Sequence, residues 1–268
     1  MKDSQYLVRP NTRLRLAEYD PADTGTFKDR DEADAELKDH RKRLFELQEL
    51  FYAEDKHAFL VVLQGMDAAG KDGAIRHIFT GVNPQGCEVH SFKEPAGEET
   101  QHDYLWRVHK VTPRRGMIGV FNRSHYEDVL VVRVHQQIPQ RMLAQRFEQI
   151  NAFERTLAEN NTTLLKFFLH ISKEEQRKRL QARLDHSRKY WKVSPSDLAE
   201  RKLWDDYQKA YEDVFYHCNA AHAPWYIIPA NKKWFRNVLI SRILVRTLEA
   251  LKMHYPKPQF DLTKLKVT

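Results

Sequence analysis

Apolar residues in this chain form short continuous runs that alternate with longer stretches of helical periodicity. Runs with the length and composition of buried strands occupy residues 59–63, 117–121, 163–169 and 224–229, and a short strand is also predicted over residues 87–92, after a turn signal at residues 83–86. Between these runs, apolar residues recur at three- and four-residue intervals, as they do on one face of a helix. Strands alternating with helices predict an α/β fold, in which helices cover both faces of a five-stranded parallel sheet.

The expected helices account for much of the remaining chain. They begin near residue 31 and after the first strand, and they cover regions 104–108, 139–159, the segment after Ser172, 204–214 and 232–254. Residues 1–30 show neither an apolar strand-like run nor helical spacing, and they contain two prolines. This predicts an irregular N-terminal leader. With no internal repeat and a length that suits one core, residues 1–268 are predicted to form a single domain.

A glycine-rich turn follows the first predicted strand and leads into a helix. From residue 65 it has the sequence GMDAAGKDG, which fits the P-loop pattern G-x-x-x-x-G-K except for an aspartate at the Ser/Thr position. In such loops the backbone N–H groups, the lysine and the helix N-terminus bind phosphate, so a chance glycine-rich turn is the weaker interpretation. The predicted phosphate-binding residues are Gly65, Ala68, Ala69, Gly70, Lys71, Asp72 and Gly73.

Two carboxylates accompany this loop. Asp67 lies inside it and Asp72 directly follows the lysine. A carboxylate beside a bound phosphate repels it unless a metal ion or a proton lies between them, and Mg²⁺ is the usual partner of phosphates and carboxylates. We therefore expect Mg²⁺ as the cofactor, with Mn²⁺ able to replace it.

A second polar segment, residues 122–128, follows the third predicted strand. Right-handed crossovers place it at the same sheet edge as the glycine-rich loop, where parallel sheets bind ligands. Ser124 and Glu127 have the spacing of a helix capping box, as do Ser172 and Glu175 further on. Arg123 and Asp128 are not needed by a cap, so they are the functional candidates.

Positive charge is concentrated after the fourth predicted strand. The chain has 44 Lys and Arg residues against 37 Asp and Glu residues, a net charge of +7 that favours a polyanionic partner. Residues 173–192 alone contain eight basic and three acidic residues. Small P-loop kinases have a lid at this position, which closes over phosphates and supplies cations. We therefore predict a basic helical lid in residues 173–215, with a merely solvated surface as the alternative.

Several classes of protein are disfavoured. The two cysteines, Cys87 and Cys218, lack the spacing of a zinc site or a disulfide framework. The N-terminus has no apolar signal core, and no window is apolar over the length of a membrane span. We expect a cytoplasmic protein without membrane or nucleic-acid partners.

Three segments together resemble the polyphosphate kinase 2 family. They are residues 65–73, residues 121–128, and the Tyr190-Trp191-Lys192 motif with residues 204–207. The likeness extends over nearly the whole chain and implies a P-loop kinase-like three-layer fold. It also implies Mg²⁺-dependent phosphoryl transfer between inorganic polyphosphate and nucleotides. Met66-Asp67 and Lys71-Asp72 resemble the members of the family that accept nucleoside mono- and diphosphates. A homo-oligomeric assembly is expected.

The resemblance also assigns roles. Lys71 and the loop amides would hold phosphates, Asp67 would orient the accepting phosphate, and Asp67 and Asp128 would bind Mg²⁺. Asn122 and Arg123 would hold the nucleotide's phosphates. The residues expected to line a polyphosphate track in the lid are Arg179, Arg183, Lys189 and Lys192. Lys38 and Lys42, on the first predicted helix, are expected to lie away from this track.

Two other functions are compatible with these residues. An ATP-dependent P-loop kinase would share the loop and the lid, but it needs a donor adenine site, for which no sequence signal was found. A non-catalytic nucleic-acid binder would use the basic segment and show steeply salt-dependent affinity. Such a binder would have no use for an aspartate inside the phosphate loop.

Overall fold

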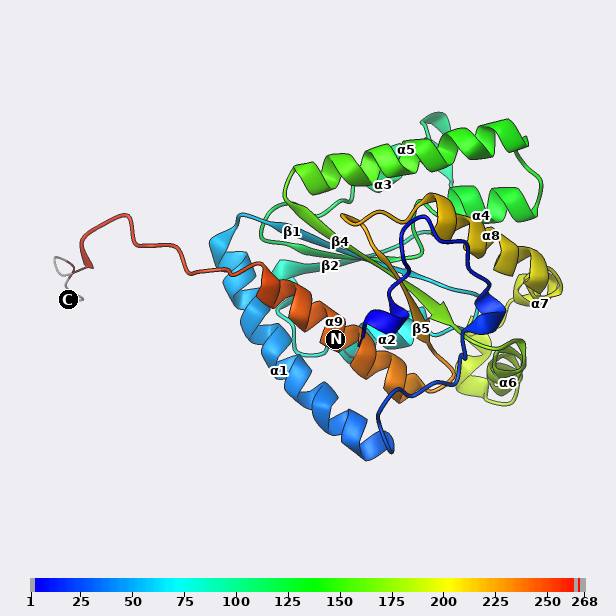
Figure 1. The fold of residues 1–268 in the computed structure, drawn as a ribbon, viewed down its shortest axis with the longest axis horizontal. Helices are drawn as coiled ribbons and strands as arrows, with labels where there is room; N and C mark the ends of the chain where they lie inside the picture. Colours follow the sequence, from blue (N-terminus) through cyan, green and yellow to red (C-terminus); the bar gives the residue numbers. More distant parts are fainter. Residues whose placement is uncertain (1–2, 263–264, 266–268) are drawn as a thin grey trace.

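One parallel sheet forms the centre of the molecule (Figure 1). The computed structural model describes residues 3–262 and residue 265. Within them the strand order is β2-β3-β1-β4-β5, and every pairing is parallel. The strands are β1 (Ala58–Gln64), β2 (Cys87–Ser91), β3 (Ile118–Asn122), β4 (Thr162–His170) and β5 (Trp225–Pro229). The predicted five-stranded parallel sheet is confirmed.

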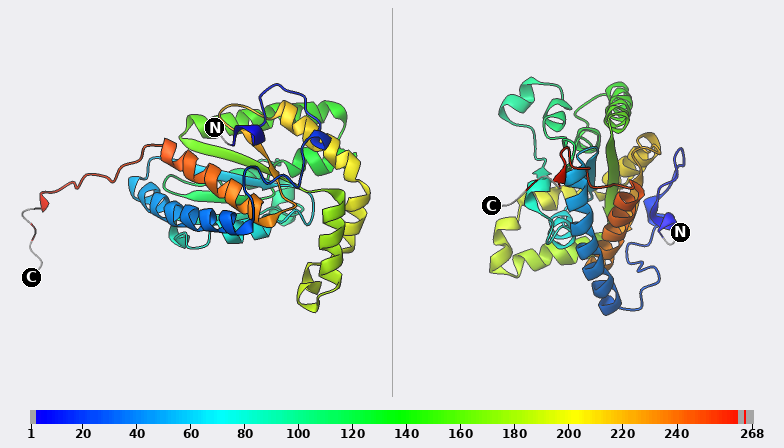
Figure 2. Two further views of the ribbon diagram at one scale, coloured as in Figure 1. Left: turned by 60° about the horizontal axis from the view of Figure 1, so that its bottom comes forward. Right: turned by 90° about the vertical axis from the view of Figure 1, so that its left-hand side faces the viewer.

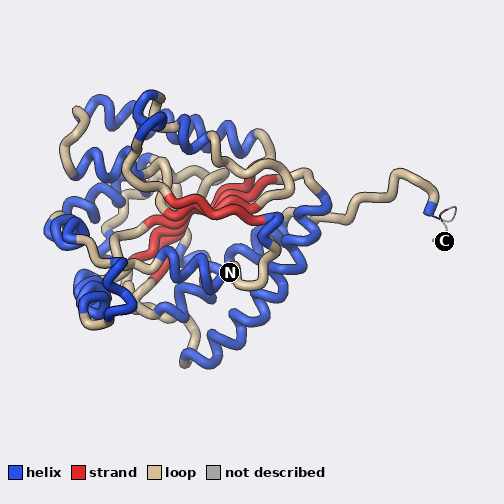
Figure 3. The backbone as a smooth tube through the Cα atoms, turned by 180° about the vertical axis from the view of Figure 1, so that it is seen from behind, coloured by secondary structure: helices blue, strands red, loops and turns tan. Residues whose placement is uncertain are grey.

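Helices cover both faces of this sheet (Figure 3). One layer contains α1 (Arg30–Glu54), α2 (Lys71–Ile78) and α9 (Lys233–Ala250). The other contains α3 (Trp106–His109), α4 (Glu127–Val134), α5 (Gln140–Glu159) and α8 (Trp204–His217). The helix predicted around residue 106 is reduced to one turn. None of the helices in the described part has the length and apolarity to cross a membrane.

The burial of the strands in the core accounts for the apolar runs in the sequence. All seven residues of β1 are buried, as expected for a central strand with helices on both faces. On α1, the predicted apolar face of Leu37, Leu44, Leu47 and Phe51 is buried against the sheet and α9. The leader is irregular as predicted, yet it belongs to the core: the Val8 N–H donates to the carbonyl of Trp225 at 2.9 Å.

The basic segment forms an arm that projects from the sheet edge (Figure 2). This lid arm consists of α6 (Lys173–Leu184), a 3-10 helix (Ser187–Lys192) and α7 (Pro195–Lys202). Its exposed surface includes the aromatic rings of Tyr190 and Trp191. Residues 186–197, which show neither helical nor strand periodicity in the sequence, contain the 3-10 helix and the start of α7.

The two predicted capping boxes have different outcomes. Ser172 caps α6 by accepting from the Glu175 N–H at 3.1 Å, but the Glu175 carboxylate bonds to Arg179 instead of returning to Ser172. The box at Ser124 is wrong, because α4 begins only at Glu127 and no side chain caps it. The Glu127 side chain is therefore available for another role.

Candidate phosphate-binding active site

The glycine-rich loop joins the end of β1 to α2, as predicted. Gly65 (φ 148°) and Gly70 (φ 104°) have backbone angles that residues with side chains rarely adopt. A Cβ atom at Gly65 would lie 2.9 Å from the carbonyl oxygen of Leu169, and one at Gly70 would collide with Nη1 of Arg236. Both glycines are therefore required by the close packing around the loop.

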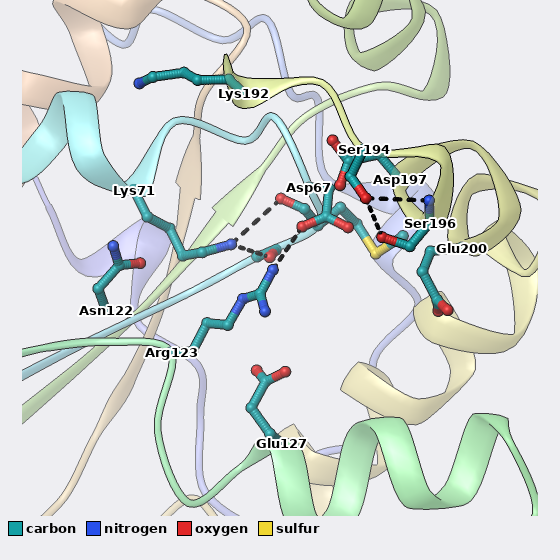
Figure 4. Close-up of polar contacts among 12 residues, drawn as sticks. Asp67, Lys71, Asn122, Arg123, Glu127, Lys192, Ser194, Ser196, Asp197 and Glu200 are labelled. Carbon is teal, nitrogen blue, oxygen red and sulfur yellow. Dashed lines mark hydrogen bonds and ion pairs between the residues drawn. The ribbon is translucent and has the colours of Figure 1, made fainter. Parts of the chain in front are cut away.

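Lys71 is the first residue of α2, and its ammonium group turns back into the loop. Nζ donates to the carbonyl oxygen of Gly65 at 2.6 Å and lies 3.5 Å from that of Met66 (Figure 4). Burial, together with the nearby charge of Arg123, lowers the pKa of Lys71. A bound phosphate would supply the negative charge that this buried cation lacks.

Arg179, on α6, holds the outer side of the loop. Its Nη1 donates to the carbonyl oxygens of Ala68 (3.0 Å) and Ala69 (2.8 Å), and its Nη2 donates to that of Ala230 (2.6 Å). Its Nε donates to the Glu175 carboxylate at 2.7 Å. Arg179 was predicted to line a polyphosphate track. It borders the cleft, and through these contacts its guanidinium also supports the loop.

Arg236, on α9, lies beneath the same loop, and the sequence analysis missed it. Its side chain is 1% exposed, Nη1 lies 3.4 Å from the Ala69 carbonyl oxygen, and Nη2 donates to Asn237 at 2.8 Å. Within the described residues it has no carboxylate partner. Burial and the charge of Arg179 lower its pKa. The signal was an arginine among the apolar residues on the buried face of an amphipathic helix, next to Phe235 and near Leu239.

Arg123 lies between two carboxylates. Its Nη2 forms an ion pair with Asp67 Oδ1 at 2.8 Å, and Glu127 faces it from α4 (Figure 4). Glu127 is fixed by Gln64 of β1, whose Nε2 donates to it at 3.0 Å. Although burial opposes it, the charges of Glu127 and Asp67 raise the pKa of Arg123. The two segments predicted to meet at the sheet edge are thus in direct contact.

Asp72 links the loop to β3 and to the lid arm. Asn122 Nδ2 donates to Asp72 Oδ1 at 2.8 Å, and Lys192 Nζ lies 3.7 Å from Asp72 Oδ2. Burial alone would raise the pKa of Asp72, but the Asn122 hydrogen bond and the Lys192 charge lower it. Within the lid arm, Arg183 pairs with Asp197 at 2.7 Å.

Asp128, predicted to bind metal, points elsewhere. Its carboxylate lies 3.7 Å from Arg107 Nη2 and 3.8 Å from Arg146 Nη1, and it does not line the cleft. Burial raises its pKa although both arginines oppose that shift. Successive helical residues point about 100° apart, so only one of Glu127 and Asp128 can face the loop. Metal binding by Asp128 therefore stays a prediction, and it is Glu127 that faces Arg123.

The loop opens into a cleft of about 1520 Å³. Fifteen lysines and arginines line it against four aspartates, an excess larger than the +7 of the whole chain. The predicted site residues that line it are Asp67, Ala68, Gly70, Lys71, Asp72, Gly73, Asn122, Arg123, Arg179, Arg183, Lys189 and Lys192. Lys38 of α1 lines it too, so the expectation that Lys38 lies away from the track is wrong. The cleft is built to hold a polyanion.

Known proteins share this chain's sequence and fold. The family model of polyphosphate kinase 2 matches residues 27–256. An AMP/ADP-polyphosphate phosphotransferase of Meiothermus ruber is 54% identical over 262 residues, which cover 97% of this chain and 98% of the relative. An ADP-polyphosphate phosphotransferase of Rhodopseudomonas palustris is 44% identical over 269 residues, 96% and 93% of the two chains. A crystal structure of polyphosphate kinase 2 from Arthrobacter aurescens TC1 matches with a TM-score of 0.92 at 43% identity, covering 96% and 92%.

Proposed function

Because the chain belongs to the polyphosphate kinase 2 family, we propose that it transfers a phosphoryl group between inorganic polyphosphate and a nucleotide. The observation that supports this most is the cleft, where a phosphate-binding loop opens between fifteen basic and four acidic residues. A nucleotide alone carries too few charges to need so many cations. A linear polyphosphate carries about one negative charge per phosphate and would engage many of them at once.

We propose AMP and ADP as the nucleotides. The relatives at 54% and 44% identity are named for AMP/ADP and for ADP, respectively. In the direction of ATP synthesis, an oxygen of the terminal phosphate of ADP forms a bond to the end phosphorus of polyphosphate. The bridging P–O bond breaks, and the chain leaves one phosphate shorter. The acceptor oxygen is already anionic at neutral pH, so no strong base is required.

The side chains then act by positioning and by neutralising charge. Lys71 and the loop N–H groups hold the reacting phosphates where negative charge develops. Arg123, oriented by Asp67 and Glu127, binds the phosphates of the nucleotide together with Asn122. The basic walls of the cleft hold the rest of the polyphosphate chain.

We also propose that Mg²⁺ acts with these residues. The donors fit it: Asp67 and Asp72 line the cleft, and Glu127 lies beside Arg123. Among the described residues no three metal-binding side chains are grouped, yet Mg²⁺ in kinases commonly takes one or two carboxylates and completes its shell with phosphates and water. Asp67 and Glu127 are the proposed ligands, Mn²⁺ could replace the ion, and the ion would neutralise charge on the transferring phosphoryl group.

The test is phosphoryl transfer without ATP. Purified protein with long-chain polyphosphate, ADP and Mg²⁺ should form ATP, followed by phosphorus NMR. The control omits polyphosphate, because an ATP-dependent nucleotide kinase, the less favoured alternative, can form ATP and AMP from two molecules of ADP. ATP formation that does not depend on polyphosphate, or no ATP formation at all, would overturn the proposal. We also propose that the chain acts in the cytoplasm as a homo-oligomer, which cell fractionation and light scattering would test.

A further inference from the structure

A charged network in the core contacts the segment between β3 and α4, which joins Arg123 to Glu127. Lys166 of β4 and Glu154 of α5 pair at 2.6 Å, and their side chains are 0% and 1% exposed. Lys166 Nζ also donates to the Tyr126 hydroxyl at 2.8 Å and to the Cys218 carbonyl at 2.9 Å, which uses its three N–H groups. All three N–H groups of the Lys166 ammonium are therefore hydrogen-bonded within the protein, away from solvent.

The other partners come from the segment between β3 and α4. The Tyr126 hydroxyl donates to Glu154 Oε1 at 2.7 Å, and His125 Nε2 lies 3.2 Å from the same oxygen. Burial alone would raise the pKa of Glu154, but the charge of Lys166 and the His125 bond lower it, so the carboxylate stays ionised. The pair thus binds two consecutive side chains of one short loop.

A buried ion pair is a weak source of stability, because its desolvation offsets its attraction and apolar residues of similar size pack as well. The interior here is otherwise apolar: the rings of Trp225 and Tyr126 pack at 4.9 Å beside Lys166. A positional role explains the network better than a stabilising one. What it positions follows from the sequence, since Tyr126 precedes Glu127 and lies three residues after Arg123.

Arg123 itself needs such support. Its φ angle of 62° lies in the left-handed region, which is unfavourable for a residue with a side chain. On one side its N–H donates to the Leu63 carbonyl at 3.0 Å. On the other side, Tyr126 and His125 are held by the network. Contacts on both sides of Arg123 along the chain therefore hold its strained backbone. The contacts of His125 and Tyr126 also hold the start of α4, where Glu127 lies.

We propose that Tyr126, held by the Glu154–Lys166 pair, is a positioning residue that sets Arg123 and Glu127 for the nucleotide. The proposal rests on the proposed function for the roles of Arg123 and Glu127. It predicts that the hydroxyl of a buried tyrosine, remote from solvent, controls the nucleotide side of the reaction and leaves the polyphosphate side unchanged.

Tyr126→Phe is the variant of choice. Removing Glu154 or Lys166 would leave the other charge buried and unpaired, which is expected to unfold the protein. Deleting the hydroxyl leaves Lys166 with Glu154 and the Cys218 carbonyl, and leaves Glu154 with Lys166 and His125. The matched control is Tyr226→Phe, a buried hydroxyl near Arg246 that follows Trp225 in β5 and so faces the other side of the sheet.

Tyr126→Phe should raise the KM for ADP at least fivefold and lower kcat, with the KM for polyphosphate within twofold of wild type. Hydrogen exchange in residues 122–128 should become faster. Tyr226→Phe should change none of these. Wild-type exchange in Tyr126→Phe, or equal increases in both KM values, would overturn the inference. Exchange needs no turnover, so it decides the positioning role even if the protein makes no ATP and the proposed function fails.

Discussion

The cleft contains two sets of cations that differ in how they are held. Around the loop, Lys71, Arg236 and Arg179, the last on α6, have largely buried side chains that contact backbone carbonyls. On the lid arm, the Arg188 and Lys189 side chains are exposed, and the neighbouring Trp191 is 78% exposed. The first set is held by hydrogen bonds to the backbone, whereas Arg188 and Lys189 of the second set extend into solvent.

This difference predicts a division of labour. Fixed charges in a site with little water stabilise a transition state without reorganising, which makes them effective in catalysis. Exposed charges are screened by salt and add mainly to the binding of a long polyanion. The loop cations should therefore control kcat, and the lid cations should control the KM for polyphosphate. Variants in each set test whether these two effects are separate.

The largest effect is expected from Lys71→Ala. The ammonium group is the buried cation nearest the reacting phosphates, so its loss should lower kcat by about 100-fold or more. Steady-state ATP formation measures this, with circular dichroism to check the fold. Arg141→Ala, an exposed cation on α5 outside the cleft, is the control and should behave as wild type. Near-normal turnover of folded Lys71→Ala would remove Lys71 from the chemistry.

The next effect separates neighbouring acids. Glu127→Gln should raise the Mg²⁺ concentration for half-maximal activity about tenfold, because a lost ligand can be offset by more metal. Asp128→Asn should leave that concentration unchanged and lower Tm slightly, since Arg107 and Arg146 lose one nearby negative charge while Arg107 keeps its ion pair with Glu99. Magnesium titrations of both variants give the answer. The reverse pattern would return Asp128 to the metal site.

Arg236→Met should separate stability from activity. Arg236 is buried and has no carboxylate partner among the described residues. Its removal should raise Tm, because folding then no longer requires a guanidinium to be transferred out of water. Turnover should fall roughly tenfold, because the loop loses a cation beneath Gly70. Arg236→Lys, which keeps the charge, should recover part of the turnover. Unchanged kcat in the methionine variant would show that Arg236 only fills space.

A smaller effect is expected in the lid arm. Replacing Arg183 and Lys189 together by Ala should raise the KM for long polyphosphate a few-fold and flatten its salt dependence. The KM for ADP should change less. The matched control replaces Arg141 and Arg155, two exposed arginines of α5 that do not line the cleft. Equal weakening in both double variants would mean that the lid provides only long-range attraction.

The sequence predicted the sheet and the loop because four strands were apolar runs, the short edge strand β2 followed a turn signal, and the loop had fixed glycine positions. It failed where helical phase or packing decided the outcome. Assigning Glu127 to a cap left Asp128 as the candidate, but α4 begins later and turns Glu127 toward Arg123. Arg236 could not be placed beneath a loop 166 residues away by any local pattern. Arg179 lies in a basic segment typical of a lid, yet its guanidinium donates to the carbonyl oxygens of the loop.

The most direct test of this division is the single-turnover rate of ATP formation at saturating polyphosphate and ADP. At saturation, binding no longer limits the reaction, so only the chemical step and its positioning are compared. The account predicts that the Arg183→Ala/Lys189→Ala variant keeps the wild-type rate within about twofold, while Lys71→Ala loses about 100-fold or more. A lid variant as slow as Lys71→Ala would contradict the account, because the cations of the lid arm would then stabilise the transition state too.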